Sequence, residues 1–390
     1  MNDILQFKDK ARQVLILPVL IFVLFSCKSF LERSVNETNL SYDIRVKLRI
    51  GNEINVIYNR DIAVEDAITG DRILKNEFKK KIMFSFNDGK CMINGFLFQS
   101  PVLIYSKKQM LININGRDYF GTIKVIPDKN GIEVINTLPI ETYLVSVVQS
   151  EMPLSFQDEA LKTQAVIART YSYYFMGKYG SSRNFDVDNT VGYQVYNGYN
   201  RKIKYEKIFR LMRVIKESRG LIIKYDNRPI IAYFHSNSGG KLSSGKEYFG
   251  SSSDLPYLQA KDDPYSTEMP GGKWNYTINY DDFKDTFDVS SDLSDDMFVK
   301  NDDGMIKSLK LGDMVFTAKE LRRAIGYSKL KSERFRITFD NPENMILFEG
   351  LGFGHGVGLS QWGAENMARQ GFKFDEIIKF YYPDTDLGYY

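Results

Sequence analysis

Two stretches of the sequence decide the fold: SEMP at Ser150–Pro153 and ALKTQAVIARTY at Ala160–Tyr171. They place one carboxylate, Glu151, in the break between two helices with apolar faces. The first helix must end there, because the residue before Pro153 is pushed out of the helical region. A carboxylate in such a break can be half desolvated, and half-desolvated carboxylates exchange protons near neutral pH. The alternative is an ordinary surface residue at a helix end.

The residues on either side support this helical hairpin. Pro139 suits the first turn of the first helix. Its buried face is formed by Tyr143, Leu144, Val147 and Val148. Ser155 and Asp158 resemble a capping pair for the second helix. That helix carries a stripe of mostly small residues, which lets another backbone approach closely: Leu161, Ala165, Ala168, Ser172 and Phe175.

Residues 41–137 are predicted to be rich in β-strands. Apolar and polar residues alternate from Ile44 to Ile50, as in a half-buried strand. Residues 111–116 and 121–126 are two further strand candidates, and Asn115-Gly116 is a strong turn signal between them. Cys91 is expected on an adjacent strand, buried or half-buried. Together with the later helices this predicts an α+β fold, in which a β-rich N-terminal portion packs on a mixed helical and stranded region over 138–390.

The second half mixes helices, strands and charged segments. Residues 201–217 form a basic helix, whose outer face is either simply solvated or holds an anionic wall polymer. Residues 221–223 and 230–234 are predicted as strands around the turn at Asp226-Asn227. The acidic insertion near 281–303 is expected to lie at the surface. Residues 360–369 and 375–382 return to helix.

The N-terminus has the pattern of an export signal over residues 1–26. A basic region precedes an apolar run over 14–25, about a dozen residues and too short to span a bilayer comfortably. The run ends at Cys27, in a loose bacterial lipobox. Cleavage before Cys27 would leave a lipidated cysteine, a tether over 27–40 and an exported lipoprotein that faces the cell wall or periplasm. An uncleaved anchor helix or an ordinary signal peptide are the alternatives.

Composition excludes several classes of function. The net charge of +3 is too small to indicate nucleic-acid binding. Two histidines and one remaining thiol, Cys91, cannot build a tetrahedral zinc site without carboxylates, so no metal is predicted. With Cys27 lipidated, no internal disulfide can form. Aromatic residues make up 14% of the chain, which permits sugar-stacking surfaces.

Two loops stand out besides the Glu151 break. One is His235–Gly240, small polar residues that follow an apolar run. The other, Gly350–Gly363, begins with five glycines in nine residues, a cost in backbone entropy that makes sense where a ligand or another backbone passes close. It lacks the lysine and spacing of a phosphate-binding loop. Neither histidine alone indicates catalysis, and no nucleophile-elbow pattern surrounds Ser236 or Ser238.

Taken together, these motifs resemble the stage II sporulation protein D family, also called the SpoIID/LytB or amidase-enhancer family. The resemblance covers about residues 41–390 and rests on ordered segments: 138–144, 151–153, 159–171, 233–240, 255–258, 321–326, 352–364 and 377–383. It implies a lytic transglycosylase that acts on peptidoglycan glycan strands stripped of peptide stems and leaves 1,6-anhydro-N-acetylmuramic ends. The family's catalytic glutamate falls on Glu151, and its glycine-rich loop on residues 352–363, with His355, Gln361 and Trp362 matching.

The chain departs from the family in one place. Well-known members bind zinc through a cysteine in a Cys-Gln-Val-Tyr-like stretch, whereas this chain has Tyr193-Gln194-Val195-Tyr196. The resemblance therefore implies no zinc here, and no cofactor is predicted.

From these residues we expect Glu151 to act as a single general acid and base. The polar lining and substrate-binding loop are expected from His235, Ser236, Ser238, Gly239, Gly240, His355 and Gln361. Tyr171 and Trp362 are candidate sugar platforms, with a place in the core as the alternative for each. A different class of function remains open: a glycan-binding protein that enhances a separate cell-wall amidase without cutting. A purely structural lipoprotein is the third reading.

Overall fold

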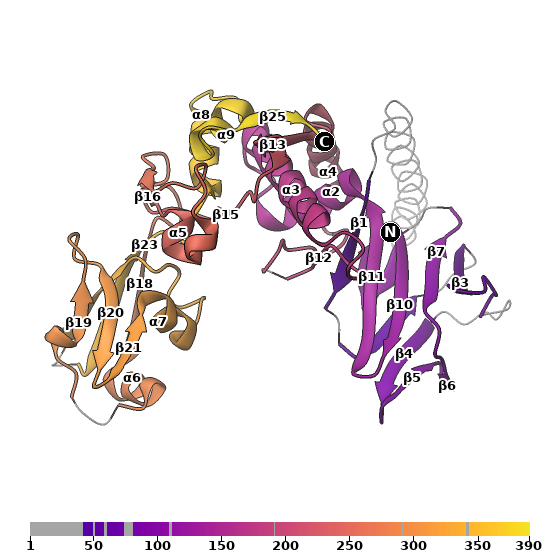
Figure 1. The fold of residues 1–390 in the computed structure, drawn as a ribbon, viewed down its shortest axis with the longest axis horizontal. Helices are drawn as coiled ribbons and strands as arrows, with labels where there is room; N and C mark the ends of the chain where they lie inside the picture. The colour runs from indigo at the N-terminus through magenta and orange to yellow at the C-terminus, as the bar shows by residue number, and fades with distance from the viewer. Residues whose placement is uncertain are drawn as a thin grey trace, which may run out of the picture. The chain divides into compact units, whose positions relative to one another are not determined.

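The computed structural model describes residues 42–49, 51–57, 61–73, 81–108, 111–190, 192–289, 292–340 and 343–390 (Figure 1). The predicted signal segment, Cys27 and the tether lie outside these residues. Strands predominate up to residue 139 and are mixed with helices after it, which confirms the α+β class with a β-rich N-terminal portion. The chain divides into unit 1, Met1–Ser155 with Ala168–Ile222 and Tyr389–Tyr390, and unit 2, Phe156–Ile167 with Ile223–Gly388. Within the described residues, no helix has both the length and the apolar character needed to cross a bilayer.

Unit 1 contains two six-stranded sheets. The first sheet has the order β12 (Val187–Asp188), β1 (Asp43–Leu48), β11 (Gly131–Pro139), β10 (Thr122–Asp128), β7 (Val102–Ser106) and β3 (Ile62–Asp66). The second has the order β6 (Phe96–Leu97), β5 (Lys90–Ile93), β4 (Lys81–Asn87), β2 (Glu53–Ile57), β8 (Ile112–Ile114) and β9 (Arg117–Tyr119). Ile44, Val46 and Leu48 point into the core, as their alternation predicts.

One predicted connection is wrong. The turn at Asn115-Gly116 joins β8 to β9, a short strand that the sequence analysis did not separate, and not β8 to β10. Asn115 and Gly116 both have positive φ, 48° and 82°, as the tight hairpin turn requires. Cys91 lies on β5 and is buried, in agreement with its predicted place.

Helices continue directly from the first sheet. Helix α2 (Ile140–Glu151) follows β11 without a loop, and Met152 has extended φ and ψ before Pro153. Helix α3 (Asp158–Tyr179) begins three residues beyond Ser155, so Ser155 does not cap it. Helix α4 (Tyr205–Glu217) packs against α2. Since α2 also contacts β1 and β11, unit 1 extends past the predicted division at residue 137.

The second half is made of short elements. The hairpin β13 (Leu221–Tyr225) and β14 (Arg228–Pro229) turns at Asp226-Asn227 as predicted, and β25 (Asp386–Tyr389) joins it. The expected strand over 230–234 is reduced to β15 (Phe234–His235). The remaining elements are β16 (Lys241–Leu242), α5 (Gly245–Phe249), η1 (Ser251–Ser253), β17 (Lys261–Asp262), β24 (Leu359–Ser360), α8 (Gln361–Arg369) and α9 (Phe374–Tyr381).

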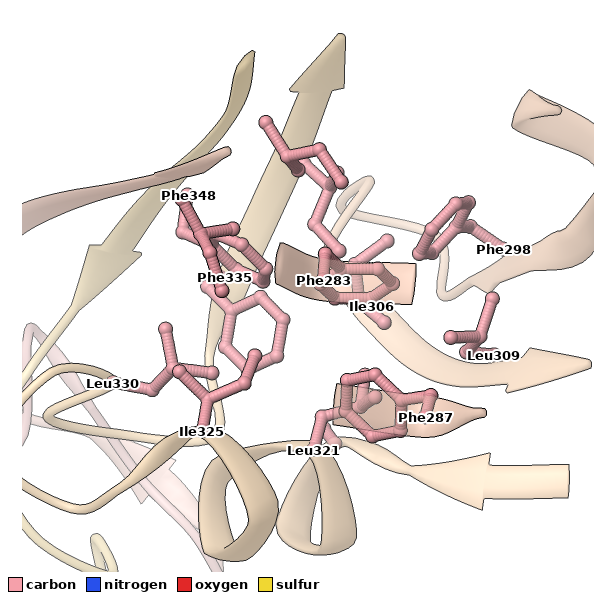
Figure 2. Close-up of a cluster of buried hydrophobic side chains, with 14 of the residues drawn as sticks. Phe283, Phe287, Phe298, Ile306, Leu309, Leu321, Ile325, Leu330, Phe335 and Phe348 are labelled. Carbon is pink, nitrogen blue, oxygen red and sulfur yellow. The ribbon is translucent and has the colours of Figure 1, made fainter. Parts of the chain in front are cut away.

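Residues 273–351 fold around a core of their own. Three-stranded sheets form from β18 (Lys273–Asn279), β23 (Met345–Leu351) and β22 (Phe335–Asp340), and from β19 (Phe298–Lys300), β20 (Ile306–Leu311) and β21 (Met314–Thr317). Between them lie α6 (Tyr280–Phe287), η2 (Asp295–Met297) and α7 (Ala318–Ile325). Figure 2 shows the phenylalanines and aliphatic side chains that meet in this core.

The acidic insertion near 281–303 is therefore more than a surface excursion. Its carboxylates, such as Asp281 and Asp282, are exposed as expected. Phe283, Phe287 and Phe298, however, are buried in the core shown in Figure 2. The acidic run dominates the composition of this segment, but the spacing of its phenylalanines determines how it packs.

We predict that Phe283→Ala destabilises this part of the chain by about 3–5 kcal/mol, the usual cost of emptying a buried aromatic site. Phe283 is fully buried and lies against Phe287 with ring centroids 4.7 Å apart. The neighbouring Asp282→Ala, at an exposed position, should change stability by less than about 0.5 kcal/mol. Hydrogen exchange of amides in β18, β22 and β23 measures the difference. Equal protection in both variants would contradict a core centred on Phe283.

Candidate active site

Glu151 is the last residue of α2 and is half-buried. Its Oε1 accepts a hydrogen bond from the Val195 backbone N–H at 2.6 Å. Burial raises the pKa of Glu151 from 4.5 to about 7, and the Val195 hydrogen bond opposes that rise only in part. The negative end of the α2 dipole acts in the same direction as burial. Near neutral pH the carboxyl group is thus divided between its protonated and ionised forms.

The loop that supplies Val195 is held to α2 and α3 by hydrogen bonds of Gln194. The Tyr143 hydroxyl donates to Gln194 Oε1 at 3.0 Å, and Gln194 Nε2 donates to the Ala168 carbonyl at 3.3 Å. Gln194 is fully buried, so the peptide that follows it has little freedom. Sequence reasoning missed both Gln194 and the Val195 N–H. The Tyr-Gln-Val-Tyr segment was the available signal, but sequence spacing does not show where its backbone donors point.

The residues at this loop do not fit a zinc ion. Tyr193 stands where the resemblance described above would place the zinc-binding cysteine. Its ring meets Phe175 edge-on at 5.0 Å, and its hydroxyl accepts a hydrogen bond from Arg183 at 3.2 Å. Cys91 lies on β5, with its Sγ 3.4 Å from the Gly131 carbonyl oxygen. Across the described residues, no three His, Cys, Asp or Glu side chains gather as metal ligands would.

Tyr171 belongs to the core of unit 1. Only 4% of it is exposed, and its ring lies against Phe175 with centroids 4.7 Å apart. Its hydroxyl reaches the Gly192 carbonyl at 3.5 Å. Because neither ring face is open to a sugar, the core alternative holds for Tyr171, and the platform interpretation is wrong.

In unit 2 the two unusual loops come together. Strands β15 and β24 pair in parallel, which places His235 opposite Ser360. Asn237 and Phe353 exchange backbone hydrogen bonds of 3.0 and 2.7 Å. The His235 ring, whose Nδ1 is 3.1 Å from the Val357 carbonyl oxygen, lies 5.4 Å from the His355 ring, centroid to centroid.

Both histidines are neutral at pH 7. Burial lowers the pKa of His235 well below its usual range, and burial lowers the pKa of His355 to about 4. Nε2 of His235 is buried and has no hydrogen-bond partner among the described residues. His355 is partly exposed among the rings of Tyr233, Tyr248 and Phe249. Uncharged imidazoles orient polar groups as dipoles and carry no net charge into the site.

A buried hydrogen-bond network fixes the loop after His235. Fully buried Asp263 accepts hydrogen bonds from Ser238 at 2.7 Å and from Ser266 at 2.5 Å. Ser266 in turn contacts Ser360, the residue that caps α8, at 2.7 Å. Ser238 is therefore a structural group and does not line a surface. Ser236 is partly exposed, and its carbonyl accepts the Trp362 backbone N–H at 3.0 Å.

Glycines allow these two loops to touch. Gly239 has a φ of +66°, and a Cβ there would lie 2.5 Å from the Gly352 nitrogen. Gly358 has a φ of +69°, and its Cβ would lie 2.1 Å from the Tyr233 carbonyl oxygen. Gly240 also has positive φ, +94°. The glycine-rich loop thus serves close backbone contact, one of its two predicted purposes.

Helix α8 carries the last two predicted site residues. Gln361 is buried, and its Nε2 is 3.5 Å from Gln164 Oε1. Trp362 packs on Phe156 with centroids 4.7 Å apart and remains partly exposed. Trp362 keeps its place as a candidate sugar platform. Of the predicted site residues, Glu151 and Tyr171 thus belong to unit 1, and the others to unit 2.

Comparison with known proteins agrees with this arrangement of motifs. The family model described as stage II sporulation protein matches residues 128–225, a range that holds Glu151 and Val195. The stage II sporulation protein D of Bacillus subtilis is 31% identical over 65% of this chain and 75% of its own length. The chain belongs to the SpoIID family.

Two other relatives show how far the similarity reaches. An uncharacterized protein of Brachyspira hyodysenteriae is 28% identical over 93% of this chain and 94% of its own length. The amidase enhancer of Bacillus subtilis is 29% identical over 72% of this chain and 45% of its own length. Within the SpoIID family, this chain is thus similar to relatives from quite different bacteria, and its function is related to the cell wall.

We predict that Glu151→Gln stabilises the protein at high pH only. A carboxyl group whose pKa is raised on folding stabilises the folded state when the pH lies below its pKa in the unfolded chain. This stabilisation is lost as the pH rises through the folded-state pKa of about 7. The neutral amide escapes that loss, so the variant should gain about 3 kcal/mol at pH 9 and almost nothing at pH 4. Denaturant unfolding at the two pH values measures it. A gain that is equal at both would show that Glu151 is not desolvated.

We also predict that Gly358→Ala destabilises the protein by about 3 kcal/mol or more, because it combines left-handed backbone strain with overlap against the Tyr233 carbonyl. Gly371→Ala is the matched control. Gly371 also has positive φ, +95°, but no atom lies within 4 Å of its Cβ position, so strain alone should cost about 1 kcal/mol. Thermal unfolding compares the two. Similar losses would mean that close loop contact is unimportant.

Proposed function

We propose that this SpoIID-family protein is a peptidoglycan lytic transglycosylase, with Glu151 as its single general acid and base. The observation that carries the proposal is a half-buried carboxyl group with a pKa of about 7, held at one oxygen by the Val195 N–H. A group balanced between two protonation states at neutral pH is suited to give and to take a proton. The substrate would be a glycan strand stripped of peptide stems.

The reaction needs only one such group. Most glycosidases use two carboxylates, because a water molecule must be activated or a covalent intermediate formed. In a lytic transglycosylase, the bond from C1 of N-acetylmuramic acid to the glucosamine oxygen breaks, and the 6-hydroxyl of the same muramic residue bonds to C1. Glu151 gives its proton to the leaving oxygen and then takes the proton of the 6-hydroxyl. Atoms balance without water, and Glu151 ends protonated as it began.

Unit 2 has groups of its own that are suited to hold sugar. Its neutral His235 and His355, with the Val357 carbonyl, are dipoles of the kind that stabilise developing positive charge. Trp362 offers a partly exposed indole for stacking. The predicted lipid at Cys27 would hold the exported chain at a membrane that faces its substrate.

A second function, of another class, has its own support. The relative named amidase enhancer favours a protein that binds glycan and stimulates a cell-wall amidase without cutting. The two functions differ in what the protein does alone. Purified protein incubated with stripped glycan would release anhydro ends if it is an enzyme. It would leave intact strands, and raise the rate of an added amidase, if it is an accessory protein.

We predict that Glu151→Gln slows release of anhydro products by about 10²–10⁴-fold while the fold is retained. For the parent protein, kcat/KM should fall as the pH rises above about 7, because the acid form of Glu151 is lost. Mass spectrometry of products from stripped strands gives both results. Asp282→Asn, a loss of one carboxylate at an exposed position of α6, should leave the rate unchanged. Cleavage by Glu151→Gln at the parent rate would exclude the assignment.

A further inference from the structure

The positive charge of this protein is concentrated in one segment. Residues 201–219 contain eight lysines and arginines and only two acids, Glu206 and Glu217. The whole chain has a net charge of +3, so the remainder is net negative. Six of these eight cations, each exposed or partly exposed, form what we call the basic face: Lys202, Lys204, Lys207, Arg210, Arg213 and Lys216.

The packing of α4 fixes the direction of the basic face. Its apolar side is buried in unit 1, through Ile208, Leu211, Met212, Val214 and Ile215. The helix therefore cannot rotate to bring its cations inward. Helix α4 carries four of them, and its 13 residues span about 20 Å, longer than a single sugar. Like charges held in one place repel each other, and an anionic partner removes that repulsion.

One residue of the basic face, Arg210, contacts the turn that follows the candidate catalytic residue. Helix α4 packs against α2, the helix that ends in Glu151. Arg210 donates from Nη1 to the Leu154 carbonyl at 2.7 Å, three residues beyond Glu151 in the chain. Both groups belong to unit 1. An anionic polymer that lies over Arg210 would thus be close to the turn that carries Glu151.

The chemistry of the glycan supplies such an anion. In a strand that bears stem peptides, the lactyl group of each muramic residue is tied up as an amide. Hydrolysis of that amide leaves a free carboxylate on every disaccharide, so the stripped strand is a regular polyanion. Lysine and arginine side chains are the natural partners of carboxylates repeated along a chain.

We propose that the basic face of residues 201–219 binds the free lactyl carboxylates of peptide-stripped glycan and so selects stripped strands for the site at Glu151. The inference rests on the proposed function and adds the surface by which the substrate is chosen. The basic face is a binding surface and takes no part in the chemical step. Salt weakens selection by charge, since the Debye screening length falls to about 3 Å at 1 M ionic strength.

The test is equilibrium binding of stripped glycan to the full-length protein carrying Glu151→Gln, so that strands stay intact. Adding Lys204→Gln, Lys207→Gln and Lys216→Gln should weaken binding about tenfold at 0.1 M salt. The same three positions changed to Arg should restore it. The matched control removes three exposed lysines elsewhere, Lys90, Lys307 and Lys310, and should change affinity less than about twofold.

The ligand is varied as well. Glycan whose carboxylates are converted to methylamides should bind the parent and the triple Lys→Gln variant equally. Equal binding of free and amidated glycan by the parent would overturn the inference. So would tighter binding of teichoic acid, or of vesicles of anionic phospholipid, than of stripped glycan at the same concentration of charge. Binding as expected, with no cleavage by the parent protein, would instead refute the proposed function and leave the inference standing.

Discussion

The interruption at Pro153 is the constraint on which the site depends. Helix α2 cannot continue through the residue before a proline, so it ends at Glu151 and Met152 becomes extended. This leaves the carboxyl group at the negative end of a helix and half removed from water. Each condition disfavours ionisation, and the pKa of Glu151 rises to about 7. A single backbone turn thus gives an ordinary glutamate a pKa near neutral pH.

Buried polar groups position the loops of interest within each unit. In unit 1, Gln194 holds the loop of Val195 against α2 and α3. The Val195 N–H can therefore bond to Glu151, and the pKa of Glu151 stays raised despite this hydrogen bond. In unit 2, Asp263 holds the turn after His235 and, through Ser266, the start of α8. A buried network in which every polar group is hydrogen-bonded makes a loop rigid. Without hydrogen-bond partners, the same polar groups would be costly to bury.

Local structural features could be predicted well from the sequence, whereas roles that depend on contacts between distant segments could not. The proline, the alternation of Ile44, Val46 and Leu48, and the Asp226-Asn227 turn each act within a few residues, and each is where it was expected. The sequence leaves the role of Tyr171 open, because the same aromatic ring can serve as a core residue or as a sugar platform. Which it is depends on neighbours far along the chain, and burial against Phe175 and near Gly192 decided it.

By itself, the sequence determined the α+β class, the helix break that places Glu151 at the end of a helix, and the motifs shared with the SpoIID family, because these depend on local backbone preference and on ordered residue types. Only the tertiary structure decided which donor reaches Glu151, that His235 and His355 are neutral, and that Ser238 is bound to Asp263. Those properties come from desolvation and from contacts between distant segments. No local pattern encodes how much water a folded chain leaves around a side chain.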